Sequence, residues 1–171
     1  GGWDETLTCW QDYELGFRLL RAAPRPAWCS SVFHCIYRTL DSITGASLSE
    51  NAEGIEQVLC KLAKEVEKAV DFSLQSAPNP PETIFFSSET ADGASTLAQC
   101  RLALWLRVHI IAGQFCAEGA SSTADALLSA VGALLRRVSW LDRVVARLLM
   151  AYTSRGGRGA WRFAALWTRL R

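Results

Sequence analysis

The feature that most constrains this chain is a long apolar segment in its second half, residues 98–118 (AQCRLALWLRVHIIAGQFCAE). Its large apolar side chains fall on every side of a helix. A helix that is hydrophobic all round belongs in the centre of a protein or in a membrane. Because charged residues leave an apolar run shorter than the ~20 residues that span a bilayer, we expect a buried central helix. A few polar side chains interrupt the segment, among them Arg101, Arg107, His109 and Gln114.

The segments around this helix have the periodicity of amphipathic helices. The clearest covers residues 55–72, where apolar side chains recur every three or four positions and charged residues occupy the other faces. A first helix is opened by Asp4 and ended by the prolines that follow residue 23. In residues 140–152 we expect Val144 and Leu148 to lie inside, and we expect Trp161 to belong to the core. Further helices are predicted over residues 27–40, 123–138 and 161–170.

The sequence therefore predicts an all-α fold class, a bundle of seven or eight helices in which residues 1–171 form a single domain. We expect no signal peptide, because the sequence opens Gly-Gly-Trp with neither a basic start nor an apolar run. The longest segment that lacks Asp, Glu, Lys and Arg is residues 26–37, which is too short to span a bilayer. A cytoplasmic protein is expected.

Charge is distributed unevenly along the chain. From Gly93 onward eleven Arg stand against three acidic residues, a net charge of +8, and the remainder therefore carries −7. Such an asymmetry fits packing of one half on the other, or a charged partner. The run Arg155-Gly156-Gly157-Arg158-Gly159 has the composition of nucleic-acid-binding segments. It is short and sits at a helix junction, so no nucleic acid partner is expected.

The residues that carry catalysis and metal binding are sparse. The six cysteines form no Cys-x-x-Cys pair and the chain has only two histidines, so no metal site is predicted. Reduced thiols are expected, with a disulfide framework left open. No phosphate-binding glycine loop and no nucleophile–base spacing is present, so we expect neither an enzyme nor a cofactor.

Three stretches of the chain, residues 55–67, 112–118 and 155–163, together resemble the Bcl-2 family of apoptosis regulators. Residues 55–67 (IEQVLCKLAKEVE) are similar to the BH3 helix of the family, with Leu59 at its signature leucine and Ala63 at its small residue. Residues 112–118 (AGQFCAE) resemble the end of its central helix, and residues 155–163 (RGGRGAWRF) resemble its BH2 segment. The first helix stands where the BH4 helix of the family would be.

The sequence departs from the family pattern at two charged positions. The Asn-Trp-Gly-Arg signature that begins the family's central helix is missing, and the position of its Arg falls on Leu104. Arg101 and Arg107 lie one turn to either side of that position. The Asp that follows the small BH3 residue in the family is Lys64 here. Divergence of this degree looks more like a viral or otherwise remote homologue than a vertebrate one.

The resemblance implies a hydrophobic groove that binds the amphipathic BH3 helix of a pro-apoptotic partner. Arg101 is the first candidate, and Arg107 the second, for the cation that would position the partner's Asp. An ordinary solvated arginine and ordinary core packing are the alternatives for these positions. The groove residues implied are Val66, Val70, Leu74, Phe85, Phe86, Arg101, Leu104, Trp105, Arg107 and Val108.

The leading functional hypothesis is therefore an apoptosis inhibitor that binds BH3 helices. A Bcl-2-fold viral inhibitor of host innate signalling without a BH3 groove is the alternative from the same fold class. A pro-apoptotic member of the family is also left open, and from a different class a secreted helical cytokine with Cys9, Cys29 or Cys35 in disulfides. The resemblance further leaves open a homodimer and a mitochondrial outer-membrane association through a tail beyond Arg171.

Overall fold

The computed structural model describes residues 3–21, 47–75, 92–135 and 138–171, and every regular element in these ranges is a helix. The all-α fold class is thereby confirmed. The described ranges hold six α-helices where seven or eight helices were predicted for the whole chain, and the helix predicted over residues 27–40 lies outside them. The elements are α1 (Gln11–Arg21), the short 3-10 helix η1 (Leu48–Asn51), α2 (Ala52–Gln75), α3 (Asp92–Ala117), α4 (Ser121–Leu134), α5 (Trp140–Thr153) and α6 (Ala160–Leu170).

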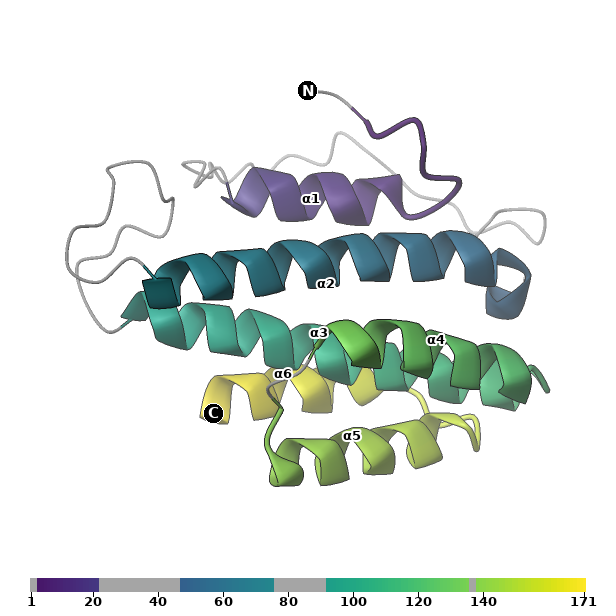
Figure 1. Ribbon diagram of the computed structural model, residues 1–171. Coiled ribbons are helices and arrows are strands. Elements are labelled where there is room, and N and C mark those ends of the chain that lie inside the picture. The colour runs from purple at the N-terminus through teal and green to yellow at the C-terminus, as the bar shows by residue number, and fades with distance from the viewer. Residues whose placement is uncertain (1–2, 22–46, 76–91, 136–137) are drawn as a thin grey trace, which may run out of the picture.

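Helix α3 is the centre of the bundle, as its composition predicts. It packs against α2, α4, α5 and α6, and Figure 1 shows α2 on one side of it and α5 on the other. Apolar side chains on opposite sides of α3 are buried in two separate clusters. Leu104, Val108 and Phe115 belong to the first cluster, whereas Leu106 and Ile110 belong to the second. A helix enclosed in this way needs apolar residues on all its faces.

Helix α2 confirms the predicted amphipathic helix and extends it by three residues at each end. Its apolar stripe is buried at Ile55, Leu59, Leu62 and Val66. The start of α2 is held near the end of α3 by one acidic side chain, Glu118, which follows α3. Its carboxylate accepts hydrogen bonds from Ser47 Oγ at 2.6 Å, Leu48 N at 3.0 Å and Ser49 N at 2.8 Å.

The first helix begins later than the sequence predicts, at Gln11 rather than at Asp4. Asp4 instead accepts hydrogen bonds from the backbone N and the hydroxyl of Thr6, at 3.0 and 2.6 Å. Local bonds of this kind compete with helix formation. Trp10 then has a φ of +55°, a left-handed conformation that separates this turn from α1. The prediction that Asp4 caps the first helix is therefore wrong, because its carboxylate is used in a local turn instead.

Two other predictions about the second half are wrong in detail. Helix α4 begins at Ser121, ahead of the predicted cap Thr123. Val144, Leu148 and Trp161, which were expected inside, are 42%, 64% and 57% exposed. Helix α5 has apolar residues on more than one face, and small residues such as Ala146 make the contact with the core instead.

The crossing of α3 and α5 depends on a glycine. A Cβ at Gly113 would lie 2.5 Å from the backbone oxygen of Met150 and 3.1 Å from its Cα. Only glycine allows two helix backbones to approach this closely. Among the described helices, none is both long enough and apolar enough to cross a membrane.

Candidate functional site

The residues predicted to line a groove are distributed over α2 and α3. Val66 and Val70 lie on α2, whereas Arg101, Leu104, Trp105, Arg107 and Val108 lie on α3. Leu74 is in α2, but its side chain lies outside the described part of the structure, as do Phe85 and Phe86 altogether. The structure therefore brings together two of the predicted walls, one from each helix.

The apolar residues of these walls are buried. Val66 and Val70 are 2% and 8% exposed, and Leu104 and Val108 are 6% and 1% exposed. Leu104 and Val108 share their core cluster with Leu59 and other residues of α2. In this arrangement the predicted wall of α3 is part of the core rather than the lining of an open groove.

Arg101 forms an ion pair across the α2–α3 contact. Its Nε donates to Glu67 Oε1 at 2.6 Å, and its Nη2 lies 3.4 Å from Glu67 Oε2. The Arg101 side chain is 8% exposed and that of Glu67 is 19% exposed. This two-point geometry is the strong form of an arginine–carboxylate contact. The cation predicted to receive a partner's carboxylate is occupied by a carboxylate of the chain itself.

Arg107 lies on a different side of α3. Its guanidinium carbon stands 5.3 Å from the ring centre of Trp10 and 5.9 Å from that of Tyr13, within the range of cation–π attraction. Six residues along a helix correspond to about 240° of rotation, so Arg101 and Arg107 cannot serve one site together. Arg107 instead holds the N-terminal part of the chain against the central helix.

Trp105 packs against both core clusters. The centre of its ring lies 4.5 Å from the centre of the His109 ring. His109 Nδ1 lies 3.0 Å from the backbone oxygen of Trp105. Burial lowers the pKa of His109, and the hydrogen bond to Trp105 only partly offsets this effect, while the charge of Arg147 lowers the pKa further. His109 is therefore a neutral core histidine at neutral pH.

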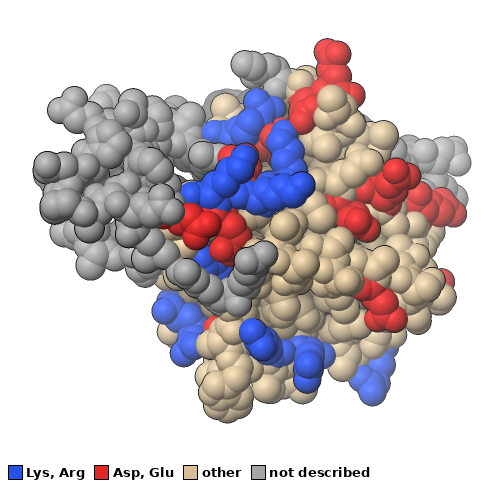
Figure 2. All heavy atoms as spheres, in the orientation of Figure 1, with Lys and Arg blue, Asp and Glu red and all other residues tan. Residues whose placement is uncertain are grey.

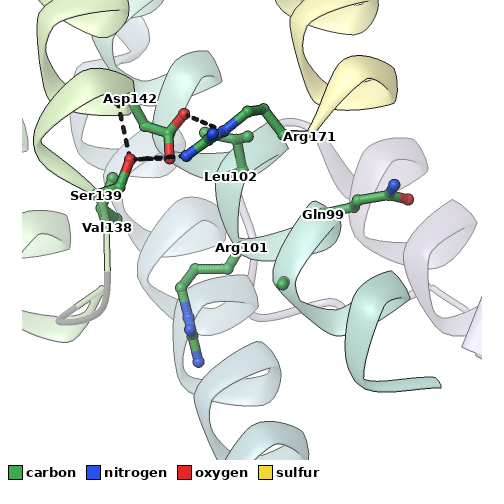
Figure 3. A pocket seen from close by; sticks show the side chains of 8 residues that line it. Gln99, Arg101, Leu102, Val138, Ser139, Asp142 and Arg171 are labelled. Atoms are coloured by element: carbon green, nitrogen blue, oxygen red, sulfur yellow. Dashed lines mark hydrogen bonds and ion pairs between the residues drawn. The ribbon is translucent and has the colours of Figure 1, made fainter. Parts of the chain in front are cut away.

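A pocket of about 420 Å³ opens beside Arg101, between the first half of α3, the start of α5 and the end of α6. Its polar lining includes Gln99, Ser139, Asp142 and Arg171. In Figure 3 Arg171 reaches towards Asp142 and Ser139, while Arg101 extends away from them. Arg171 Nε lies 3.4 Å from Asp142 Oδ1, and Arg171 Nη2 donates to Ser139 Oγ at 3.2 Å.

Asp142 is the centre of this polar cluster. Trp167 Nε1 donates to its Oδ1 at 2.8 Å, and the Asp142 backbone N donates to Ser139 Oγ at 3.2 Å, which caps α5. Burial acts to raise the pKa of Asp142. The hydrogen bonds from Ser139 and Trp167 and the charge of Arg171 outweigh burial, and the pKa lies below its usual value. The cluster joins α5 to α6 and leaves Asp142 fully engaged.

The groups that could support catalysis are few. Among the described residues, no three His, Cys, Asp or Glu side chains gather as a metal site requires. Cys9, Cys60, Cys100 and Cys116 are free thiols, and burial raises the pKa of the first three. The cytokine hypothesis requires Cys9, Cys29 or Cys35 in disulfides. Cys9 is a free thiol, and Cys29 and Cys35 lie outside the described residues. Cys9, Cys60 and Cys100 are therefore poor nucleophiles, because burial disfavours their thiolate form.

Sequence reasoning overlooked Glu67 and Asp142. Glu67 ends the BH3-like stretch and resembles a solvated charge on an amphipathic helix. Only its distance from Arg101 reveals its role. Asp142 could have been found, because Ser139 and Asp142 have the spacing of a capping box.

Comparison of the chain with protein-family models, with curated proteins and with solved structures gives no match in any of the three.

Proposed function

We propose that this chain is a Bcl-2-like inhibitor of apoptosis that binds the BH3 helices of pro-apoptotic proteins between α2 and α3, in the cytoplasm or at the mitochondrial outer membrane. The observation that carries the proposal is the Glu67–Arg101 pair. Here a carboxylate on the BH3-like helix of the chain is bound by an arginine on the central helix. A BH3 partner would offer Arg101 the same kind of group as Glu67, an acidic side chain on an amphipathic helix.

Binding by this route is an exchange. The carboxylate of the partner replaces Glu67 at Arg101, so the total number of charge contacts is unchanged. Net affinity must then come from the apolar anchors of the partner helix. Because Val66, Val70 and Leu104 are buried, α2 must move away from α3 before those anchors can enter. The cost of this opening reduces the apparent affinity.

Replacement of the Glu67 carboxylate by that of a partner can be tested by substituting each member of the Glu67–Arg101 pair in turn. BH3 peptides are titrated calorimetrically into the wild-type chain, into Glu67→Ala and into Arg101→Ala, after circular dichroism has shown that each protein is folded. Glu67→Ala removes the internal competitor and is expected to bind more tightly than the wild type, whereas Arg101→Ala is expected to lose affinity. The matched control is Lys68→Ala, an exposed neighbour of Glu67. Absence of binding to folded wild type and folded Glu67→Ala would contradict the proposal.

A second candidate function is favoured by one specific observation, the burial of the predicted groove walls. A Bcl-2-like protein with a closed groove would act as an inhibitor of host innate signalling through another face. It would bind no BH3 peptide in the same titration, and Glu67→Ala would not change that result.

A further inference from the structure

Helix α5 carries a row of large apolar side chains on its solvent side. Trp140, Val144, Leu148 and Tyr152 recur at intervals of four residues. They are 75%, 42%, 64% and 46% exposed. Residues at this spacing lie along one face of a helix. The row is apolar although it makes no part of the core, and apolar patches of this kind mark interaction sites.

Helix α6 has the same construction. Phe163, Leu166 and Leu170, spaced three and four residues apart, are exposed along one side of α6. Trp161 is also exposed, but it lies about 200° around the helix from Phe163, on the opposite side. The inner sides of both helices face the core, where Ala146 and Leu149 of α5 and Ala160 and Ala164 of α6 join the cluster around α3. The outer faces of the two helices therefore turn away from α3.

The exposed charge of residues 138–171 is of one sign. Residues 138–171 contain seven Arg, all exposed, and one acidic residue, Asp142. Asp142 is buried and engaged by Ser139, Trp167 and Arg171. In Figure 2 blue side chains alternate with uncharged surface along the lower edge of the molecule, where α5 lies in Figure 1.

We propose that the outer faces of α5 and α6 dock on an anionic phospholipid surface. The apolar rows would enter the boundary between head groups and acyl chains, as interfacial helices do. Exposed arginines beside them, such as Arg143 and Arg147, would bind lipid phosphates while their stems cover apolar surface. Trp140 and Tyr152 have the amphipathic rings that favour this boundary. The two helices would lie along the membrane surface rather than cross it.

Two other occupants fit this surface less well. A second copy of the same face would bring like charges together, which opposes association. A nucleic acid would engage the arginines, but Leu148, Leu166 and Leu170 would have no apolar partner there. An anionic lipid surface satisfies both the charge and the apolar rows. The inference does not depend on BH3 binding, because α5 and α6 lie outside the α2–α3 contact.

The test is flotation of the purified chain with phosphatidylcholine vesicles, with and without phosphatidylserine. The chain is expected to float only with vesicles that contain phosphatidylserine, and less so as salt is raised. Leu148→Glu and Leu166→Glu are each expected to weaken partitioning by more than about tenfold, because a leucine no longer enters the interface. Arg143→Gln is expected to weaken it about fivefold.

The matched controls are Leu19→Glu on α1, also more than half exposed, and Lys68→Gln on α2. Both are expected to float like the wild type, and all variants are first shown to be folded by thermal unfolding. Three results would overturn the proposal. They are no flotation of the wild type with phosphatidylserine, equal flotation with phosphatidylcholine alone, and retention of binding by folded Leu148→Glu. Sedimentation that shows a wild-type dimer abolished by Leu148→Glu, without vesicle binding, would assign the face to a second copy instead.

Discussion

Glu67 on α2 and Arg101 on α3 form a two-point ion pair, with Arg101 Nε 2.6 Å from Glu67 Oε1. The pair lies at the contact between α2 and the central helix α3, largely removed from water. A guanidinium in that position needs a carboxylate, because an unpaired buried charge is costly. The stability of the α2–α3 contact and the availability of Arg101 to a partner are thus set by the same interaction.

Arg101→Ala is expected to destabilise the protein by about 2 kcal/mol. Removal of one member of a fully buried pair costs about 3–5 kcal/mol, and the partial exposure of Glu67 reduces this cost. Urea unfolding followed by circular dichroism measures the change. Lys68→Ala is the control, because Lys68 is exposed on the same helix. A loss no greater than that of the control would contradict the structural role of the pair.

Gly113→Ala is expected to destabilise the α3–α5 crossing by about 3 kcal/mol, because the new methyl group would meet the backbone of Met150. Gly132→Ala in α4 is the matched control, since its Cβ would be 3.8 Å from the nearest Trp105 atom, an ordinary contact. That substitution is expected to stabilise the helix by about 0.5 kcal/mol. Equal thermal stability of the two variants would contradict the close crossing.

Glu14 is expected to govern acid unfolding. It is almost fully buried, and it accepts hydrogen bonds from Arg18 at 2.8 Å and from Lys61 at 2.6 Å. Burial acts to raise its pKa, but these two cations outweigh burial and hold the pKa below the ordinary value of 4.5. The stabilisation is therefore present above about pH 4.5 and is lost as pH falls through the lower pKa of the folded state.

Glu14→Gln tests this linkage. The variant is expected to lose about 2 kcal/mol at neutral pH, because two charge-assisted bonds become weaker. Its stability should then fall less steeply than that of the wild type between about pH 5 and pH 3. Urea midpoints measured across this range provide the comparison. Parallel curves for the two proteins would show that Glu14 is not the group responsible.

His109 is expected to affect the stability of the protein at higher pH than Glu14 does. Because burial lowers its pKa in the folded state below the ordinary 6.5, the protein is stabilised by neutral His109 above that value and loses this stabilisation as pH falls below it. His109→Gln should therefore show a smaller loss of stability than the wild type between about pH 7 and pH 5. An unchanged pH dependence in the variant would contradict the assignment.

The amphipathic helix α2 could be predicted from its hydrophobic period, and the central helix α3 from its continuous apolar composition. Helix α3 is apolar on every face and is enclosed, and the stripe on α2 is buried as its spacing indicates. Where a helix such as α5 has two apolar faces, its hydrophobic period does not indicate which face is buried. In α5 the small residue Ala146 lies against the core, while Leu148 is exposed, because close helix packing selects small side chains.

The partners of charged residues could not be predicted, since they depend on the arrangement in space. Lys61 illustrates this point. Its position on α2 suggests a local pair with Glu65, yet its Nζ lies 2.6 Å from both Asp4 and Glu14 in the N-terminal part of the chain. Arg101 likewise resembles a free cation until α2 brings Glu67 to it. Of these long-range pairs, Arg101–Glu67 is the one that lies at the candidate site.

The most direct measurement of the central claim is calorimetric titration of a BH3 peptide panel into the folded wild-type chain and into folded Glu67→Ala. The account predicts binding of a subset of peptides, tighter in Glu67→Ala because Arg101 is then free of its internal carboxylate. Substitution of the conserved Asp of the peptide by Ala should remove that gain. Absence of binding in both proteins, or equal affinity in both, would contradict the exchange at Arg101.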